Sequence, residues 1–78
     1  MGNKYKVDRV LNLQGLLCPR PGILASRALE EMAQGDILEI IANDKNSRQL
    51  FASICKKHSY KLLEFQDEPG RLRVYIKK

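Results

Sequence analysis

The residues best suited to chemistry lie in one short turn, Cys18-Pro19-Arg20-Pro21, directly before a helical pattern. At the start of a helix, free backbone amides and the positive end of the helix dipole stabilise an anion. Arg20 adds a positive charge two residues from Cys18. Both effects lower the pKa of a thiol below its free value of ~8.5, and the thiolate is the nucleophile. The sequence therefore predicts a reactive Cys18, presented by a turn that Pro19 and Pro21 stiffen.

The other groups that could do chemistry are weaker candidates. A free cysteine is often just a small buried apolar residue, and an inert Cys18 would make the chain a non-catalytic adaptor. Cys55 fits that description better, because it falls on the apolar stripe of a second helical pattern. His58, the single histidine, is expected as a solvated residue at the end of that helix. Two cysteines and one histidine do not make a four-ligand zinc set, so we expect no metal and no cofactor.

Two helices and four strands must position this turn. In the first helix an apolar stripe recurs at helical spacing, with Gly35 as its stop; the stripe consists of Pro21, Ala25, Ala28, Leu29 and Met32. The second helix is expected to be capped by Asn43 or Asp44 and to end at His58. The strands are predicted over Val7–Leu13, Asp36–Ala42, Tyr60–Gln66 and Arg71–Lys77.

The order of these elements predicts an α/β two-layer sandwich, β-α-β-α-β-β, with a mixed four-stranded sheet and both helices on one face. The first two strands are expected to be parallel, through a right-handed crossover. The last two form an antiparallel hairpin around the turn at 67–70. We expect one domain over residues 1–78, with residues 1–6 as a flexible N-terminus.

Size and charge narrow the function. A chain of 78 residues buries only about 60% of its unfolded surface, which favours a carrier, adaptor or binding module over an enzyme with an enclosed pocket. The net charge of +5 favours an acidic partner. No apolar run approaches the ~20 residues that span a bilayer, and the N-terminal residues lack a signal-peptide core. We therefore expect a cytoplasmic protein without membrane contact.

The segment Leu13–Pro21 resembles the TusA/SirA family of sulfur-carrier proteins, which is marked by Gly-x-x-Cys-Pro-x-Pro at the start of its first helix. The matching positions are Gly15, Cys18, Pro19 and Pro21. The resemblance covers nearly the whole chain, and it implies the strand order 1-2-4-3. Two positions depart from many relatives, which carry an Asp in place of Asn12 and an acidic or neutral residue in place of Arg20. Both departures make the surroundings of Cys18 more positive.

The resemblance implies a persulfide relay in which Cys18 takes sulfur from a protein donor, such as a cysteine desulfurase or a rhodanese-like protein. The acceptor is a DsrE-like or other thiol protein, and the outlets include tRNA thiolation, cofactor sulfuration and sulfur metabolism. Ile23 and Arg27, on the helix after Cys18, are expected to contact these partners, and the carrier is expected to be a monomer. The alternative is a small basic RNA-binding or regulatory adaptor domain that uses the sheet face with Arg71, Arg73 and Tyr75.

Overall fold

The computed structural model describes residues 5–16 and 20–78. Its elements are β1 (Arg9–Asn12), α1 (Arg20–Glu31), β2 (Ile37–Ala42), α2 (Ser47–His58), β3 (Lys61–Glu68) and β4 (Arg71–Lys77). The order β-α-β-α-β-β is thus confirmed. Among these residues no helix is both long enough and apolar enough to cross a membrane.

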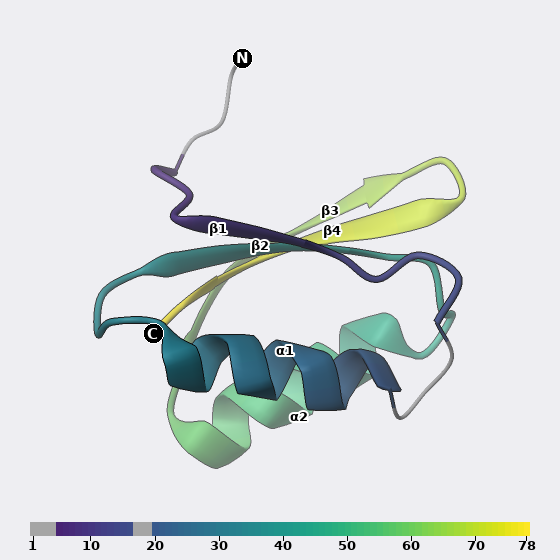
Figure 1. Ribbon diagram of the computed structural model, residues 1–78. Helices are drawn as coiled ribbons and strands as arrows, with labels where there is room; N and C mark the ends of the chain where they lie inside the picture. The colour runs from purple at the N-terminus through teal and green to yellow at the C-terminus, as the bar shows by residue number, and fades with distance from the viewer. Residues whose placement is uncertain (1–4, 17–19) are drawn as a thin grey trace.

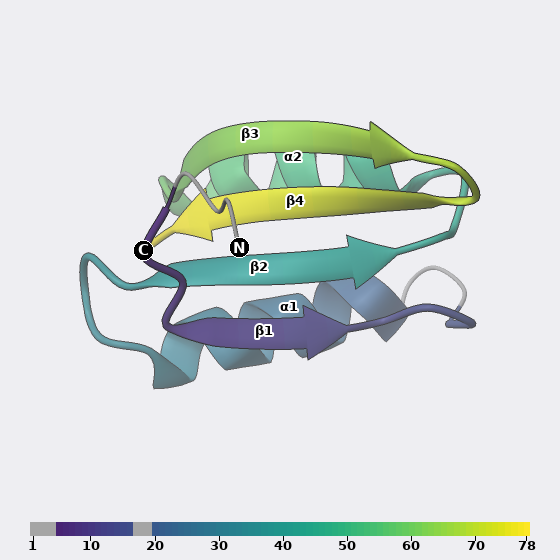
Figure 2. The ribbon, with the colours of Figure 1, turned by 90° about the horizontal axis from the view of Figure 1, so that it is seen from above.

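The four strands form one sheet in the order β1-β2-β4-β3, which confirms the predicted order. β1 pairs with β2 in parallel, and β4 pairs antiparallel with both β2 and β3. Both helices cover the same face of this sheet, and neither lies on the other face (Figures 1 and 2). The fold is therefore the expected two-layer sandwich.

The core lies between the sheet and the helices. The alternating strand positions Leu72, Val74 and Ile76 are buried, as the period-2 pattern predicted. The predicted stripe of α1 is buried as well. Phe51, with 0% of its surface exposed, brings α2 into the same cluster. Burying each large apolar side chain stabilises the fold by about 1.5–3 kcal/mol, so this shared cluster holds the two layers together.

The end of α1 and the start of α2 differ from the prediction. α1 ends at Glu31, before Gly35, because Asp36 closes a turn there: its carboxylate accepts the Ala33 N–H (3.1 Å) and its own N–H donates to the Ala33 carbonyl (3.0 Å). Capping by Asn43 or Asp44 was wrong, since α2 begins at Ser47 after an N-cap residue, Asn46, whose side chain makes no capping bond. The Asp44 carboxylate instead accepts the N–H of Asn46 (3.2 Å) and shapes the preceding turn.

Candidate functional site

The turn that was predicted to carry the chemistry is described on both sides of Cys18. Cys18 and Pro19 lie outside the described residues, and Gly15, Arg20 and Pro21 lie within them. Before the cysteine, Gly15 has φ +86°, and a Cβ built there would meet nothing within 4 Å. Glycine is therefore required at this position for its backbone conformation and not for space.

A side chain from another element anchors Gly15. Its N–H donates to Asn43 Oδ1 (2.9 Å), across the end of the parallel β1–β2 pair. The Asn12 side chain also accepts the N–H of Gln14 (3.1 Å). Leu13, directly after β1, is buried at 2% exposure. The segment leading to Cys18 is thus tied to β2 by a residue whose role sequence reasoning missed, since an Asn after a strand reads equally well as a helix cap.

After the cysteine, α1 begins at Arg20, and its first turn carries no acidic residue. Pro21 is buried in that turn, and its ring fits there because the first helical amides have no acceptor within the helix. Arg20 is exposed and forms no ion pair with a described residue. The N-terminus of α1 thus presents its dipole and a free guanidinium with no carboxylate to offset them, an arrangement that favours a neighbouring anion.

The two predicted docking residues lie on the exposed side of α1. Ile23 is 58% exposed, and Arg27 is exposed as well. Both line a groove between α1 and α2. The structure thus brings them together with residues of α2 that the sequence alone did not associate with them.

The sheet face of the alternative RNA-binding interpretation is occupied by contacts within the chain. Tyr75 is only 2% exposed, and the ring of Tyr5 packs on it with centroids 5.1 Å apart. Arg73 forms ion pairs with the carboxylates of Glu39 and Glu68. A buried ring cannot serve as a stacking platform for a base, and a paired guanidinium is a poor phosphate ligand. The contacts of Tyr75 and Arg73 therefore argue against the RNA-binding alternative on this face.

Tyr5 belongs to the segment 1–6 that was expected to be flexible, yet it is attached to the sheet. Besides its contact with Tyr75, its hydroxyl donates to Glu64 Oε1 (3.1 Å). Tyr5 therefore covers part of the sheet face opposite the helices.

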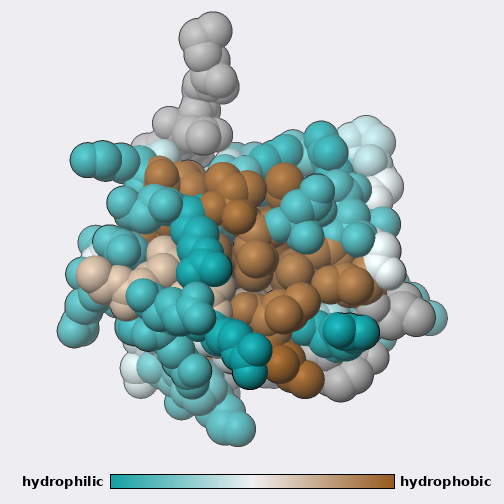
Figure 3. Space-filling view, viewed as in Figure 1, coloured by the Kyte–Doolittle hydropathy of each residue, from teal (hydrophilic) through white to brown (hydrophobic). Residues whose placement is uncertain are grey.

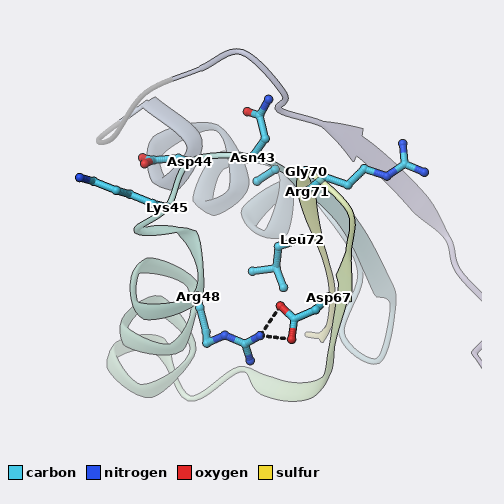
Figure 4. A pocket seen from close by; sticks show the side chains of 9 residues that line it. Asn43, Asp44, Lys45, Arg48, Asp67, Gly70, Arg71 and Leu72 are labelled. Atoms are coloured by element: carbon cyan, nitrogen blue, oxygen red, sulfur yellow. Dashed lines mark hydrogen bonds and ion pairs between the residues drawn. The ribbon is translucent and has the colours of Figure 1, made fainter.

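A second hollow lies where β2 ends and α2 begins (Figure 4). At its rim, Arg48 Nη2 donates to both carboxylate oxygens of Asp67, at 2.5 and 2.6 Å. Arg71 is paired with Glu68 (2.7 Å). Because both arginines are already neutralised by carboxylates, we assign no ligand to this hollow.

Cys55 and His58 behave as predicted. Cys55 is a free thiol with 4% of its surface exposed, and burial raises its pKa from 9.0 to about 11. A thiol that stays protonated at neutral pH is a poor nucleophile, so its role is structural. His58 is exposed at the end of α2, with its ring centroid 5.7 Å from that of Tyr60.

Comparisons with known proteins agree with this geometry. Residues 9–78 match the family model described as "Sulfurtransferase TusA". A putative sulfur carrier protein of Bacillus subtilis, YrkI, is 37% identical over 73 residues, which cover 94% of this chain and 97% of that one. Sulfur carrier protein TusA of Pseudomonas aeruginosa is 31% identical over 74 residues, covering 95% and 94% of the two chains.

A solved structure extends the likeness to the fold. The crystal structure of the SirA-like protein from Desulfitobacterium hafniense superposes with a TM-score of 0.79 at 25% identity, covering 88% of this chain and 95% of that one. The family match therefore spans both the sequence, from β1 to the C-terminus, and the arrangement of sheet and helices. The chain belongs to the TusA/SirA family of sulfur-carrier proteins.

Proposed function

We propose that this protein carries sulfur as a persulfide on Cys18. The observation that carries the proposal is the family pattern around Cys18, which stands directly before a helix whose first turn contains Arg20 and no acidic residue. Such a helix start lowers the pKa of a neighbouring thiol and so favours the reactive thiolate. Gly15, Pro19, Arg20 and Pro21 support the turn.

The transfer is a redox-neutral exchange between thiols. The Cys18 thiolate attacks the outer sulfur of a persulfide on the donor's cysteine, a new S–S bond forms, and the donor's S–S bond breaks. The donor's cysteine leaves as a thiolate, and Cys18 now carries the outer S–H. In the second step an acceptor's thiolate attacks that outer sulfur, and Cys18 is released as a thiolate. Each step replaces one S–S bond with another, so no external oxidant is needed.

The donor in this proposal is a cysteine desulfurase or a rhodanese-like protein, and the acceptor is a DsrE-like or other thiol protein. The sulfur then serves tRNA thiolation, cofactor sulfuration or sulfur metabolism. A single domain of 78 residues suits this role, because two partners must reach the same sulfur in turn. The carrier acts as a cytoplasmic monomer.

Sulfur loading tests the proposal directly. The protein is incubated with L-cysteine and a purified bacterial cysteine desulfurase, and its intact mass is then measured. Wild type should gain one sulfur atom, and Cys18→Ser should gain none. Cys55→Ser is the matched control and should load like wild type, because its thiol is buried. Equal loading of Cys18→Ser and wild type would refute Cys18 as the carrier.

The thiol's electrostatics give a second test. Arg20→Glu should raise the pKa of Cys18, because a cation near the thiolate is replaced by an anion. The rate of alkylation of Cys18 by iodoacetamide, followed against pH, measures that pKa. Lys77→Glu makes the same change of charge on β4 and is the control. Identical pH profiles for Arg20→Glu and wild type would show that Arg20 does not act on the thiol.

A further inference from the structure

The two helices pack closely together at Gly22, in the first turn of α1. A Cβ built on Gly22 would lie 3.0 Å from Leu50 Cδ1 and 3.3 Å from Ile54 Cδ1 of α2. One turn further along α1, a small residue, Ser26, again stands beside α2. A groove of about 450 Å³ runs along this seam, with walls from both helices. Because Gly22 and Ser26 are small, the apolar side chains Leu50 and Ile54 of α2 stay accessible to a binding partner in this groove.

The walls of this groove are apolar and partly exposed. Ile23, at 58% exposure, is one of two large hydrophobic residues that are exposed in the described part of the chain. Leu50 and Ile54, on the side of α2 that faces α1, are only half-buried. An apolar side chain placed here would gain about 25 cal/mol for each Å² removed from water. The groove is therefore suited to an apolar anchor.

The rim of the groove is positively charged. Arg27 and Lys57 line it beside His58, with Glu30 as the one acid among its lining residues. Neither Arg27 nor Lys57 forms an ion pair with a described residue. The arginines that do pair with carboxylates lie elsewhere in the described structure, at Arg9, Arg48, Arg71 and Arg73. Two cations without a carboxylate partner among the described residues, Arg27 and Lys57, therefore stand beside the apolar groove, and they complement an acidic surface.

Figure 3 shows a second apolar area, over β1 and the adjoining side of α1. Val10, 57% exposed, lies on that strand. Nothing in the described structure indicates what covers this area. The groove differs from this area because two cations at its rim that are unpaired within the described chain, Arg27 and Lys57, favour an acidic occupant.

We propose that the groove between α1 and α2 is the docking site for an acidic protein surface that inserts an apolar side chain. The inference rests on the proposed function, since the partner is the sulfur donor, and it assigns part of the contact to α2, outside the cysteine motif. RNA is a poorer occupant, because apolar walls offer nothing to a phosphate backbone. The groove begins in the first turns of the helix that follows Cys18, so a partner seated there also meets the start of α1.

The rate of sulfur transfer from a purified bacterial cysteine desulfurase tests this docking site, measured at low and at high ionic strength. Lys57→Glu should slow transfer about fivefold or more at low salt and approach wild type at high salt, as steering by charge requires. Ile23→Asp should slow transfer at both salt concentrations. Because Ile23 is exposed, its replacement leaves the core intact. The matched control is Lys77→Glu on β4, which should transfer at the wild-type rate.

Two further measurements separate this inference from the proposed function. Alkylation of Cys18 by iodoacetamide needs no docking and should be unchanged in Lys57→Glu, whose altered charge lies in the last turn of α2. Binding of the desulfurase to Cys18→Ser, measured by surface plasmon resonance, requires no transfer and should be weakened by Lys57→Glu and by Ile23→Asp. If wild type gained no sulfur while the groove substitutions still weakened desulfurase binding, the carrier function alone would be refuted. Wild-type binding and transfer rates in both groove variants, or tight tRNA binding that Lys57→Glu abolishes while desulfurase binding is unchanged, would overturn the docking site.

Discussion

Replacing Arg73 with Ala should destabilise the protein strongly, although Arg73 lies on the sheet face away from the helices. Its guanidinium is paired with the carboxylate of Glu39, and the two side chains are 20% and 6% exposed. After the substitution, the Glu39 carboxylate would stay buried without its cation. That is the situation in which removing one member of an ion pair costs most, because the remaining charge loses both water and partner.

The expected loss follows from these exposures. Removing one partner of a buried pair costs about 3–5 kcal/mol, and the low end, about 3 kcal/mol, applies here because Arg73 still touches water. In a domain of this size each kcal/mol shifts the melting temperature by about 4–8 °C, so the variant should melt about 12–24 °C lower. That is a large share of the ~5–15 kcal/mol that stabilises a typical domain.

Urea unfolding at pH 7, followed by circular dichroism, measures this loss. Arg9→Ala is the matched control: its pair with Glu31 (3.0 Å) has side-chain exposures of 43% and 58%, and exposed pairs contribute about 0–1 kcal/mol. The double variant Arg73→Met, Glu39→Leu removes both charges and should recover much of the stability.

The reasoning would be refuted if Arg73→Ala unfolded at the same urea concentration as Arg9→Ala, or if the double variant were no more stable than Arg73→Ala. Either result would mean that the Glu39 carboxylate finds water or another donor once Arg73 is gone. The sheet face would then be free for a binding role, which its internal ion pairs argue against.

Two further predictions concern pH. Burial raises the pKa of Cys55 from 9.0 to about 11. The unfolded thiol therefore ionises first, and the free energy of unfolding should fall as pH rises from about 9 to about 11. Burial raises the pKa of Tyr75 as well, so urea titrations should show a shallower fall in Cys55→Ser than in wild type, and equal falls would contradict the prediction. Hydrogen bonds from Arg73, chiefly, hold the pKa of Glu68 below its ordinary value of 4.5. The stabilisation from Glu68 is therefore complete above pH 4.5 and is lost as pH falls through the lower pKa of the folded state. Glu68→Gln should remove this part of the pH dependence of stability. An unchanged dependence of the unfolding free energy on acid pH in the variant would contradict the prediction.

Much of the fold could be predicted from local patterns. The alternation over Arg71–Lys77 gave the strand and its buried face, and the apolar stripe of α1 gave the side of that helix that faces the sheet. The motif around Cys18 gave the family, which the comparisons confirmed. These features are local because side-chain periodicity follows from the backbone geometry of one element at a time.

Other features depend on residues that are distant in the sequence. Periodicity placed Tyr75 on the face opposite the core, but that face is covered by Tyr5, from the other end of the chain. Asn43 reads as a helix cap, and it became the acceptor for Gly15 because β1 and β2 end side by side.

The groove beside Ile23 exists only because α1 and α2 meet at Gly22. The sequence by itself determined the order of the elements and their inward faces, and it singled out Cys18 as the candidate carrier thiol. The tertiary structure decided which outward faces are covered, since that depends on how separate elements pack, and no single element carries this information in its periodicity.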